Sequence, residues 1–348
     1  MTLTACYAAQ SDKSLLEPFK IERRKLGVND VQIAIEFCGV CHTDIHFTKN
    51  EWGGTHYPVV PGHEIIGKVT AFGAGVTHLK IGQRVGAGYI GGSCGVCASC
   101  KSSLEQYCLE GFSTIFNSPS NDPGGFSYGG YSKSIVIDKH FVLIVPTGLD
   151  PAGAAPLLCA GITTYSPLKH WGIKPGMTVG IIGLGGLGHM GVKLAHAMGA
   201  KTVMITTSKD KAMTAIKLGA DEVLISTDPV EMQGMINQFD FLLNTIPGPH
   251  DYNHYMNLLK IDGCMCILGS IGPTAELNTE PMVYGRRTIA GSLVGGIKET
   301  QEMLYFCAKH QIVADIELIK MDQINTAYER ILKNDVKYRF VIEMSSLS

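Results

Sequence analysis

The sequence predicts an α/β protein of two domains, one of which is a doubly wound parallel sheet of six strands. The chain has 348 residues, which is more than one ordinary hydrophobic core organises. Six short apolar runs, most of them separated by helix-length segments, form the pattern that a doubly wound sheet requires. The runs lie at 177–182, 202–206, 222–225, 239–245, 264–268 and 288–294. A β-rich, glycine-punctuated region precedes them.

The flanking segments predict how the domains divide. The segment at 31–37 (VQIAIEF) alternates as a half-buried strand does, and Pro151 and Pro156 mark a change of architecture. At the other end, one helix at 300–312 and one strand at 338–343 are too little for a third domain. We therefore expect the tail to rejoin the first domain. The predicted domains are 1–159, 160–295 and the returning segment 296–348.

Composition excludes several classes of function. The formal net charge is −2 and there is no block of lysine or arginine, so a nucleic acid is not the expected partner. We find no run of eighteen apolar residues and no secretory signal, so we expect no membrane span and a cytoplasmic location. Six of the eleven cysteines lie in metal-like settings, which favours ligands over disulfides. The other five are expected in the reduced core: Cys6, Cys38, Cys264, Cys266 and Cys307.

A glycine-rich turn follows the first run of the parallel sheet. It reads Gly183, Leu184, Gly185, Gly186, Leu187 and Gly188, a G-x-G-x-x-G pattern. Gly183 permits a tight turn, Gly185 lets a pyrophosphate approach the backbone, and Gly188 lets helix and strand pack closely. A glycine-rich turn alone is a weak signal, but its place between a strand and a helix favours a dinucleotide site.

The end of the second run indicates which nicotinamide cofactor binds. An NAD site usually has an acidic residue there, whereas this chain has hydroxyls and lysines. These are Thr206, Thr207, Ser208, Lys209 and Lys211, interrupted by Asp210. Such groups accommodate a 2′-phosphate, so we expect NADP(H); an ordinary polar turn is the alternative.

A compact cluster of cysteines predicts a structural zinc. The cluster is Cys94, Cys97, Cys100 and Cys108, a C-x2-C-x2-C-x7-C pattern. Four thiolates complete a tetrahedral zinc and leave no position for a substrate. A bacterial ferredoxin would place its fourth cysteine after three residues and before proline, and a zinc ribbon would have two separated pairs.

A second, scattered set predicts a catalytic zinc. It consists of Cys41, His63 with Glu64 beside it, and Cys159. Two cysteines and one histidine leave one tetrahedral position open. For each cysteine alone, a reduced core residue is the commoner alternative.

Together these segments resemble the zinc-dependent medium-chain alcohol dehydrogenases. The resemblance rests on GVCHTDIH, PGHEIIGKV, the four-cysteine lobe, LLCAGITTYSPL, GLGGLGHMGVKLAHAMG and GSLVGGIKET, and it spans essentially the whole chain. It is strongest to the NADP-dependent, cinnamyl-alcohol-dehydrogenase-like branch, which includes bacterial aldehyde reductases. The resemblance implies a GroES-like catalytic domain, a Rossmann domain and a homodimer.

The resemblance also implies roles for individual residues. Cys41, His63 and Cys159 would hold the catalytic zinc, with Glu64 as an occasional ligand. Asp44 would orient a ligand, and Thr43 with His46 would relay a proton. The implied cofactor contacts are Thr163, the Gly183–Gly188 loop, Thr206 to Lys211, Thr245, Gly269, Ser292, Leu293 and Val294. Asp210 departs from the family, because relatives often have a basic residue there.

The implied activity is reduction of aldehydes by NADPH, with oxidation of primary alcohols in reverse. Two rivals remain at this point: a zinc-free quinone reductase of the same superfamily, and a non-enzymatic zinc-binding module. The dehydrogenase would hold about two zinc ions per chain, the quinone reductase none and the module one. The substrate would be an aromatic or medium aliphatic aldehyde if Trp52, Tyr57, Phe112 and Leu293 line a pocket, although such residues are more often core.

Overall fold

The computed structural model describes residues 2–269, 272–273 and 275–347, and its chain forms two compact units. The first unit contains the chain up to Cys159 together with Gly295 onward, and the second contains Ala160–Val294. Among the described residues, no helix is long and apolar enough to span a bilayer.

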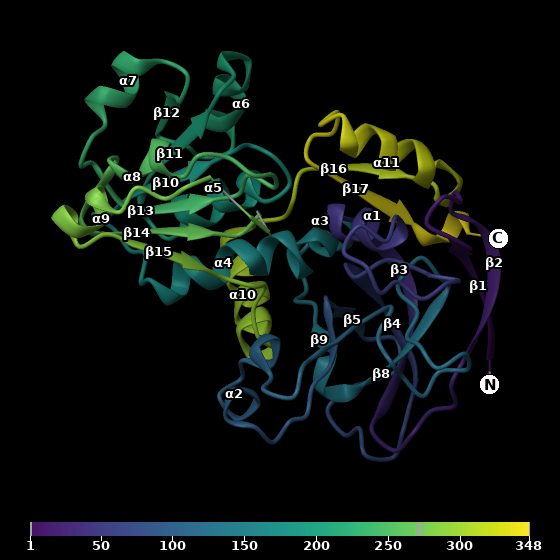
Figure 1. The fold of residues 1–348 in the computed structure, drawn as a ribbon. Helices are drawn as coiled ribbons and strands as arrows, with labels where there is room; N and C mark the ends of the chain where they lie inside the picture. The colour runs from purple at the N-terminus through teal and green to yellow at the C-terminus, as the bar shows by residue number, and fades with distance from the viewer. Residues whose placement is uncertain (1, 270–271, 274, 348) are drawn as a thin grey trace. The chain divides into compact units, whose positions relative to one another are not determined.

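The first unit is built on a seven-stranded sheet (Figure 1). Its strand order is β16-β17-β3-β4-β5-β9, and β8 pairs with β3. The strands are β3 (Asp30–Val40), β4 (Ile65–Phe72), β5 (Arg84–Ala87), β8 (Ser134–Asp138), β9 (Leu143–Ile144), β16 (Ile316–Ile319) and β17 (Arg339–Glu343). Val31, Ile33 and Ile35 of β3 are buried, so the expected alternation is confirmed. Two small antiparallel pairs complete the unit: β1 (Thr2–Ala8) with β2 (Glu17–Arg23), and β6 (Ile90–Gly92) with β7 (Ser113–Thr114).

The C-terminal tail completes this sheet. Strand β17 pairs antiparallel with β3 and parallel with β16, so the yellow end of the chain lies beside the purple start in Figure 1. Strand β16 was not expected from the sequence. The helices of this unit are α1 (His42–Thr48), α2 (Ala98–Lys101), α3 (Pro151–Ala154), α10 (Ile297–His310) and α11 (Ile324–Leu332). Short 3-10 turns are η1 (Glu105–Tyr107), η2 (Lys139–Phe141), η3 (Ala155–Leu158), η5 (Met321–Gln323) and η6 (Met344–Ser346).

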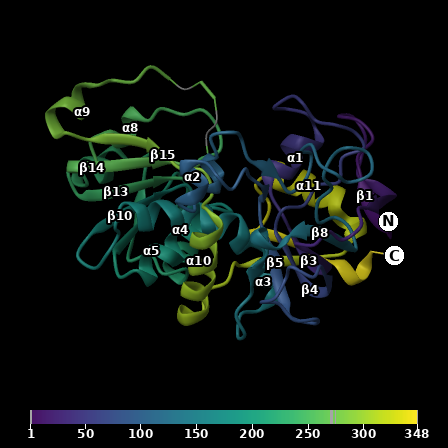
Figure 2. The same ribbon diagram turned by 90° about the horizontal axis from the view of Figure 1, so that it is seen from below.

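The second unit is the expected parallel sheet of six strands, in the order β12-β11-β10-β13-β14-β15. The strands are β10 (Thr178–Ile182), β11 (Lys201–Thr206), β12 (Glu222–Ile225), β13 (Phe239–Asn244), β14 (Leu259–Ile267) and β15 (Thr288–Gly291). Figures 1 and 2 both show β10, β13, β14 and β15 in sequence across the sheet. The helices are α4 (Ala160–His170), α5 (Gly188–Ala197), α6 (Ala212–Lys217), α7 (Pro229–Gly234), α8 (Asn253–Met256) and α9 (Glu280–Gly285), with a 3-10 turn η4 (Lys209–Lys211). The fold-class prediction is confirmed.

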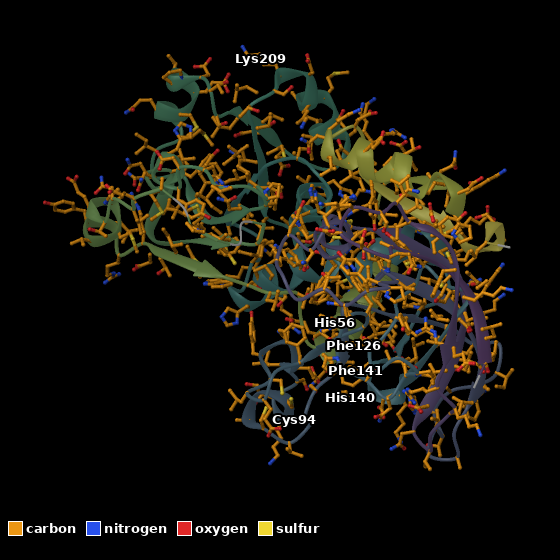
Figure 3. All side chains as sticks on the ribbon, turned by 45° about the vertical axis from the view of Figure 1, so that its right-hand side comes forward. His56, Cys94, Phe126, His140, Phe141 and Lys209 are labelled. Carbon is orange, nitrogen blue, oxygen red and sulfur yellow. The ribbon has the colours of Figure 1, made fainter. Side chains whose placement is uncertain are left out.

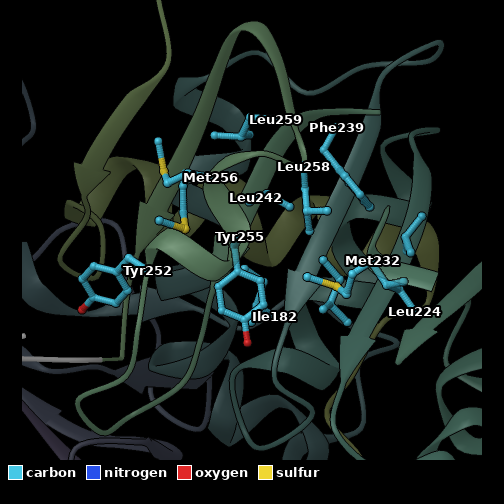
Figure 4. Close-up of a cluster of buried hydrophobic side chains, with 13 residues drawn as sticks. Ile182, Leu224, Met232, Phe239, Leu242, Tyr252, Tyr255, Met256, Leu258 and Leu259 are labelled. Carbon is cyan, nitrogen blue, oxygen red and sulfur yellow. The ribbon is translucent and has the colours of Figure 1, made fainter. Parts of the chain in front are cut away.

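Two features hold the second unit together. A Cβ on Gly191 of α5 would lie 3.1 Å from Leu243 and 3.3 Å from Ile181, so glycine allows the helix to lie close to the sheet. A buried apolar cluster joins strands to helices α7 and α8 (Figure 4). It contains Ile182, Val203, Ile205, Leu224, Met232, Phe239, Leu242, Tyr252, Tyr255, Met256, Leu258, Leu259 and Met265. The last strand is shorter than the apolar run at 288–294 predicted, since β15 ends at Gly291. Val294 adopts a positive φ of 36°, which is not a strand conformation.

Candidate metal and cofactor sites

The four-cysteine lobe brings its four sulfur atoms together. One ligand atom from each of Cys94, Cys97, Cys100 and Cys108 lies within 4.8 Å of the others. Backbone N–H groups point at these sulfurs: Cys100 N donates to Cys97 Sγ at 3.5 Å, and Cys94 N to Cys108 Sγ at 3.5 Å. These bonds favour the thiolate, and backbone donation from Cys100 and Leu109 lowers the pKa of Cys97 to about 6. Thiolates are the form that binds zinc, so this donor set fits the metal.

A buried carboxylate anchors the lobe to the rest of the first unit. Glu105 is 2% exposed and accepts a hydrogen bond from His140 Nε2 at 2.9 Å and another from Ile297 N, at the start of α10, at 3.0 Å. The contact with Glu105 raises the pKa of His140. Figure 3 labels Cys94 and His140 in this region.

The scattered set also converges, and its four members are buried. Ligand atoms of Cys41, His63, Glu64 and Cys159 lie within 4.8 Å of one another, and the sulfurs of Cys41 and Cys159 are 3.7 Å apart. Strand pairing explains the convergence, because β3 and β4 are neighbours with Cys38 opposite Ile65. Cys41 follows the end of β3, and the His63-Glu64 pair directly precedes β4.

Within the part of the chain that the structure describes, three buried atoms of this cluster lack a hydrogen-bond partner: Nε2 of His63 and both carboxylate oxygens of Glu64. His63 Nδ1 lies 2.9 Å from Asp44 Oδ1, and since a carboxylate only accepts, Nδ1 carries the proton. In the neutral ring Nε2 then presents a lone pair, and among the described residues it is a buried nitrogen without a hydrogen-bond partner. A metal ion satisfies such an atom, and the carboxylate behind the histidine is the usual support of a zinc ligand.

Asp44 also fixes the backbone around the ligands. It is fully buried on α1, and its carboxylate accepts hydrogen bonds from Cys41 N at 2.9 Å and Gly62 N at 3.0 Å. Gly62 has a φ of 103°, and a Cβ there would lie 2.7 Å from the Tyr131 ring. Glycine is thus required at the turn that delivers His63.

Glu64 is a buried carboxylate, and nearby positive charge only partly offsets the cost of burying its charge. Burial raises its pKa to about 7, although Arg339 opposes the shift, with Nη1 3.4 Å from Oε1. A Cβ on Gly39 would lie 1.9 Å from Glu64 Oε2, so glycine makes room for this side chain. Arg339 was not expected at this site from the sequence. Its position in the final strand gave no local signal of contact with Glu64.

The expected relay residues lie on α1. Thr43 and His46 are three residues apart, which places them on one face of a helix. His46 Nδ1 contacts the carboxylate of Glu51, which the sequence reasoning also missed, and the ring stacks on Trp52 at 4.6 Å. Trp52 therefore has a packing role, and it is 45% exposed.

The other residues suggested for a pocket are divided between the two units. The Tyr57 hydroxyl donates to Thr48 O at 2.9 Å, and Leu293 belongs to the second unit. Phe112 lies beside Tyr89, with ring centroids 5.9 Å apart, and the Tyr89 ring is 5.4 Å from that of His63. Tyr89 and Phe116, whose ring centroid is 6.1 Å from that of His63, are thus aromatic residues next to the scattered cluster that were not expected from the sequence.

The glycine loop lies in the second unit after β10, where neighbouring β11 and β13 run to either side. This reversal of strand order is where α/β sheets bind ligands. Gly183 has a φ of 91°, a Cβ on Gly188 would lie 1.9 Å from Gly183 O, and Gly185 faces open space. Thr245 Oγ1 donates to Ile182 O at 2.8 Å, which ties β13 to the loop.

The remaining expected cofactor residues are in the second unit. Thr206 ends β11, Thr207 is exposed, and Ser208 N donates to Thr206 Oγ1 at 3.3 Å. Lys209, labelled in Figure 3, and Lys211 are exposed on η4. Thr163 lies on α4 and Gly269 follows β14. Ser292, Leu293 and Val294 follow β15.

Two family profiles match this chain. "Alcohol dehydrogenase GroES-like domain" matches residues 27–147, and "Zinc-binding dehydrogenase" matches residues 186–309. The aldehyde reductase YahK of Escherichia coli (strain K12) is 52% identical over 342 residues, with 98% of each chain covered. The chain belongs to the zinc-binding alcohol dehydrogenases. It is therefore an oxidoreductase, as the sequence predicted.

Similar solved structures belong to the same family as these relatives. A cinnamyl alcohol dehydrogenase of Sorghum bicolor has a TM-score of 0.95 at 41% identity, covering 100% of this chain and 99% of that one. A cinnamyl alcohol dehydrogenase of Helicobacter pylori, complexed with NADP(H), has a TM-score of 0.92 at 36% identity, with the same coverage. Membership of the alcohol dehydrogenases disfavours both rivals, the zinc-free quinone reductase and the non-enzymatic module.

Proposed function

We propose that this alcohol dehydrogenase uses zinc and NADP(H) to reduce aldehydes to primary alcohols, and oxidises the alcohols in reverse. The observation that carries the proposal is the buried convergence of Cys41, His63 and Cys159, with the Nε2 atom of His63 unpartnered. Two cysteines and one histidine leave a fourth tetrahedral position for substrate. A zinc ion held there by Cys41, His63 and Cys159 would act as a Lewis acid toward the carbonyl oxygen.

The chain's own residues then hold the ligands and move the proton. Asp44 fixes the tautomer of His63, and Glu64 stands beside the cluster as an alternative ligand. Thr43 donates a proton to the oxygen of the forming alcohol, and His46 restores it. Glu51 contacts His46 and is partly exposed, so it connects this relay to solvent.

NADP(H) is supported by the glycine loop and by the polar turn after β11, and the Helicobacter pylori relative carries that cofactor. Thr207→Asp should lower kcat/KM for NADPH by about tenfold or more, because a carboxylate repels the 2′-phosphate. Kinetics with NADPH and NADH measure the change, and Thr207→Ser, which keeps the hydroxyl, should leave the preference intact. Unchanged selectivity in Thr207→Asp would contradict the assignment.

The four-cysteine lobe is proposed to hold a second, structural zinc, and thiolate ligands suit a reducing cytoplasm. A homodimer is supported by the edge strand β15 and by Val283 and Tyr284 of the preceding α9, which are 74% and 83% exposed. Sedimentation velocity on the wild type and on Tyr284→Lys tests this association.

The decisive experiment is an assay of aromatic and medium aliphatic aldehydes with NADPH and with NADH, on protein whose zinc content is measured. We expect NADPH-linked reduction and about two zinc ions per chain. Zinc-loaded protein that reduces no aldehyde with either cofactor would overturn the proposal.

A further inference from the structure

A short segment before β8 lies against the turn that carries His63. Three backbone hydrogen bonds join the two: Gly129 N to Val60 O at 2.8 Å, Tyr131 N to Pro61 O at 2.9 Å, and Gly130 N to Gly62 O at 2.8 Å. Both glycines are required for this approach. A Cβ on Gly129 would lie 2.4 Å from Pro61 O, and one on Gly130 would lie 2.5 Å from Ile65.

A buried arginine holds the same segment from the other side. Arg23 is 1% exposed, and its guanidinium donates to Tyr128 O at 2.6 Å, Gly129 O at 2.9 Å and Ser132 Oγ at 2.7 Å. The backbone on both sides of Tyr131 is therefore fixed. The Tyr131 side chain is fully buried, so its hydroxyl has one well-defined place.

That hydroxyl lies 3.3 Å from Asp44 Oδ2, and it must donate because a carboxylate only accepts. Asp44 Oδ2 also accepts from Cys41 N, while Oδ1 accepts from Gly62 N and from His63 Nδ1. Each oxygen of this buried carboxylate thus has two donors. Without the Tyr131 hydroxyl, Oδ2 keeps only the Cys41 N–H as a donor, so the carboxylate is held less firmly in the orientation that faces His63.

We propose that Tyr131 is a positioning residue for the zinc site, which acts through Asp44 to set the direction of His63 Nε2. The inference rests on the proposed function, because it requires a metal at Cys41, His63 and Cys159. Supporting groups behind metal ligands change metal affinity by about 10–100-fold when removed. The 3.3 Å contact is long for a hydroxyl donor, so the lower end of that range applies.

The test is Tyr131→Phe, which removes only the hydroxyl. Metal-free protein is titrated with Co²⁺ against a competing chelator, and the visible absorption of cobalt thiolate reports binding. The Cys159→Ser chain gives the signal of the lobe alone. We expect Tyr131→Phe to bind cobalt about tenfold more weakly at the scattered site. Affinity at the lobe should not change, and an unchanged urea-unfolding transition shows that the first unit is folded.

Two comparisons make the result specific. Tyr255→Phe, a buried tyrosine of the second unit, should bind cobalt as the wild type does. In an Asp44→Asn background, Tyr131→Phe should lower the cobalt affinity of the scattered site by less than about twofold. The reason is that Asp44, the group through which Tyr131 acts, has already been changed. A full tenfold loss in that background would overturn the inference.

The outcomes also separate the inference from the proposed function. Wild type that binds two cobalt ions, with Tyr131→Phe equal to it at both sites, overturns the role of Tyr131 alone. Wild type that binds cobalt only at the lobe overturns the catalytic zinc, and the inference falls with it.

Discussion

The two cysteine clusters of the first unit are built in opposite ways. The lobe takes four ligands from fifteen consecutive residues, and backbone N–H groups of the same short loop support its sulfurs. The scattered cluster takes its ligands from three distant segments, and buried side chains such as Asp44 and Arg339 support it. The lobe is thus a locally determined structure that depends on its metal, whereas the scattered cluster depends on the completed sheet.

The largest effect is expected at the lobe. Cys100→Ser removes one of four thiolates, and a structural zinc contributes on the order of 10 kcal/mol of local folding free energy. We expect fast amide hydrogen exchange across residues 93–111 and normal protection in β10 to β13. Ser102→Ala, an exposed change in the same loop, is the control. Full protection of the lobe in Cys100→Ser would show that it folds without its metal.

The next effect is expected at the scattered cluster. Cys41→Ser should lower kcat/KM by about a thousandfold, because Lewis-acid stabilisation is worth several kcal/mol. Zinc content should fall from about two to about one per chain while the lobe keeps its ion. Cys264→Ala, which removes a buried thiol from the second unit, should retain both zinc ions. Near-normal activity in Cys41→Ser would refute the assignment of the catalytic metal.

A smaller effect is expected from Gly39→Ala. The added Cβ would lie 1.9 Å from Glu64 Oε2 and 2.9 Å from Glu64 Cβ. Overpacking of this kind costs about 1–3 kcal/mol, which urea unfolding measures. A Cβ added at Gly234 would face open space, so the control Gly234→Ala should be as stable as the wild type. Equal stability of the two variants would mean that Glu64 moves freely, contrary to a tightly held cluster.

The smallest effect concerns pH at the base of the lobe. Contact with Glu105 raises the pKa of His140. The contribution of this contact to the free energy of unfolding is therefore full below the unfolded pKa of about 6.5, and it is lost as pH rises through the folded pKa. His140 is largely exposed, so the contribution is below about 1 kcal/mol. His140→Gln should therefore cost stability at pH 6 and little at pH 9, as measured by urea unfolding. The same loss at both values would exclude the ion pair as the cause.

Local sequence patterns were enough to predict some parts of the molecule. The six-stranded sheet follows from apolar runs, and its glycine loop follows from spacing, because Gly188 and Gly183 must touch. The end of β15 was misplaced, since the apolar run does not reveal that Val294 adopts a positive φ. Distance along the chain explains the other omissions. Arg339 reaches Glu64 through the pairing of β17 with β3, and Tyr131 reaches Asp44 through backbone hydrogen bonds between its segment and the turn at residues 60–62. Neither kind of contact leaves a periodic trace in the sequence.

The place of β17 has a consequence for how the protein is made. This late strand lies between β16 and β3, while residues 160–294 form a continuous unit of their own. Domains generally fold as they leave the ribosome, N-terminal first. Here the order should invert: the middle of the chain can fold during synthesis, whereas the N-terminal sheet must wait for its last strand. Newly made Cys41 and Cys159 thiols should therefore stay exposed to stray metals and oxidants until residues 339–343 have been made.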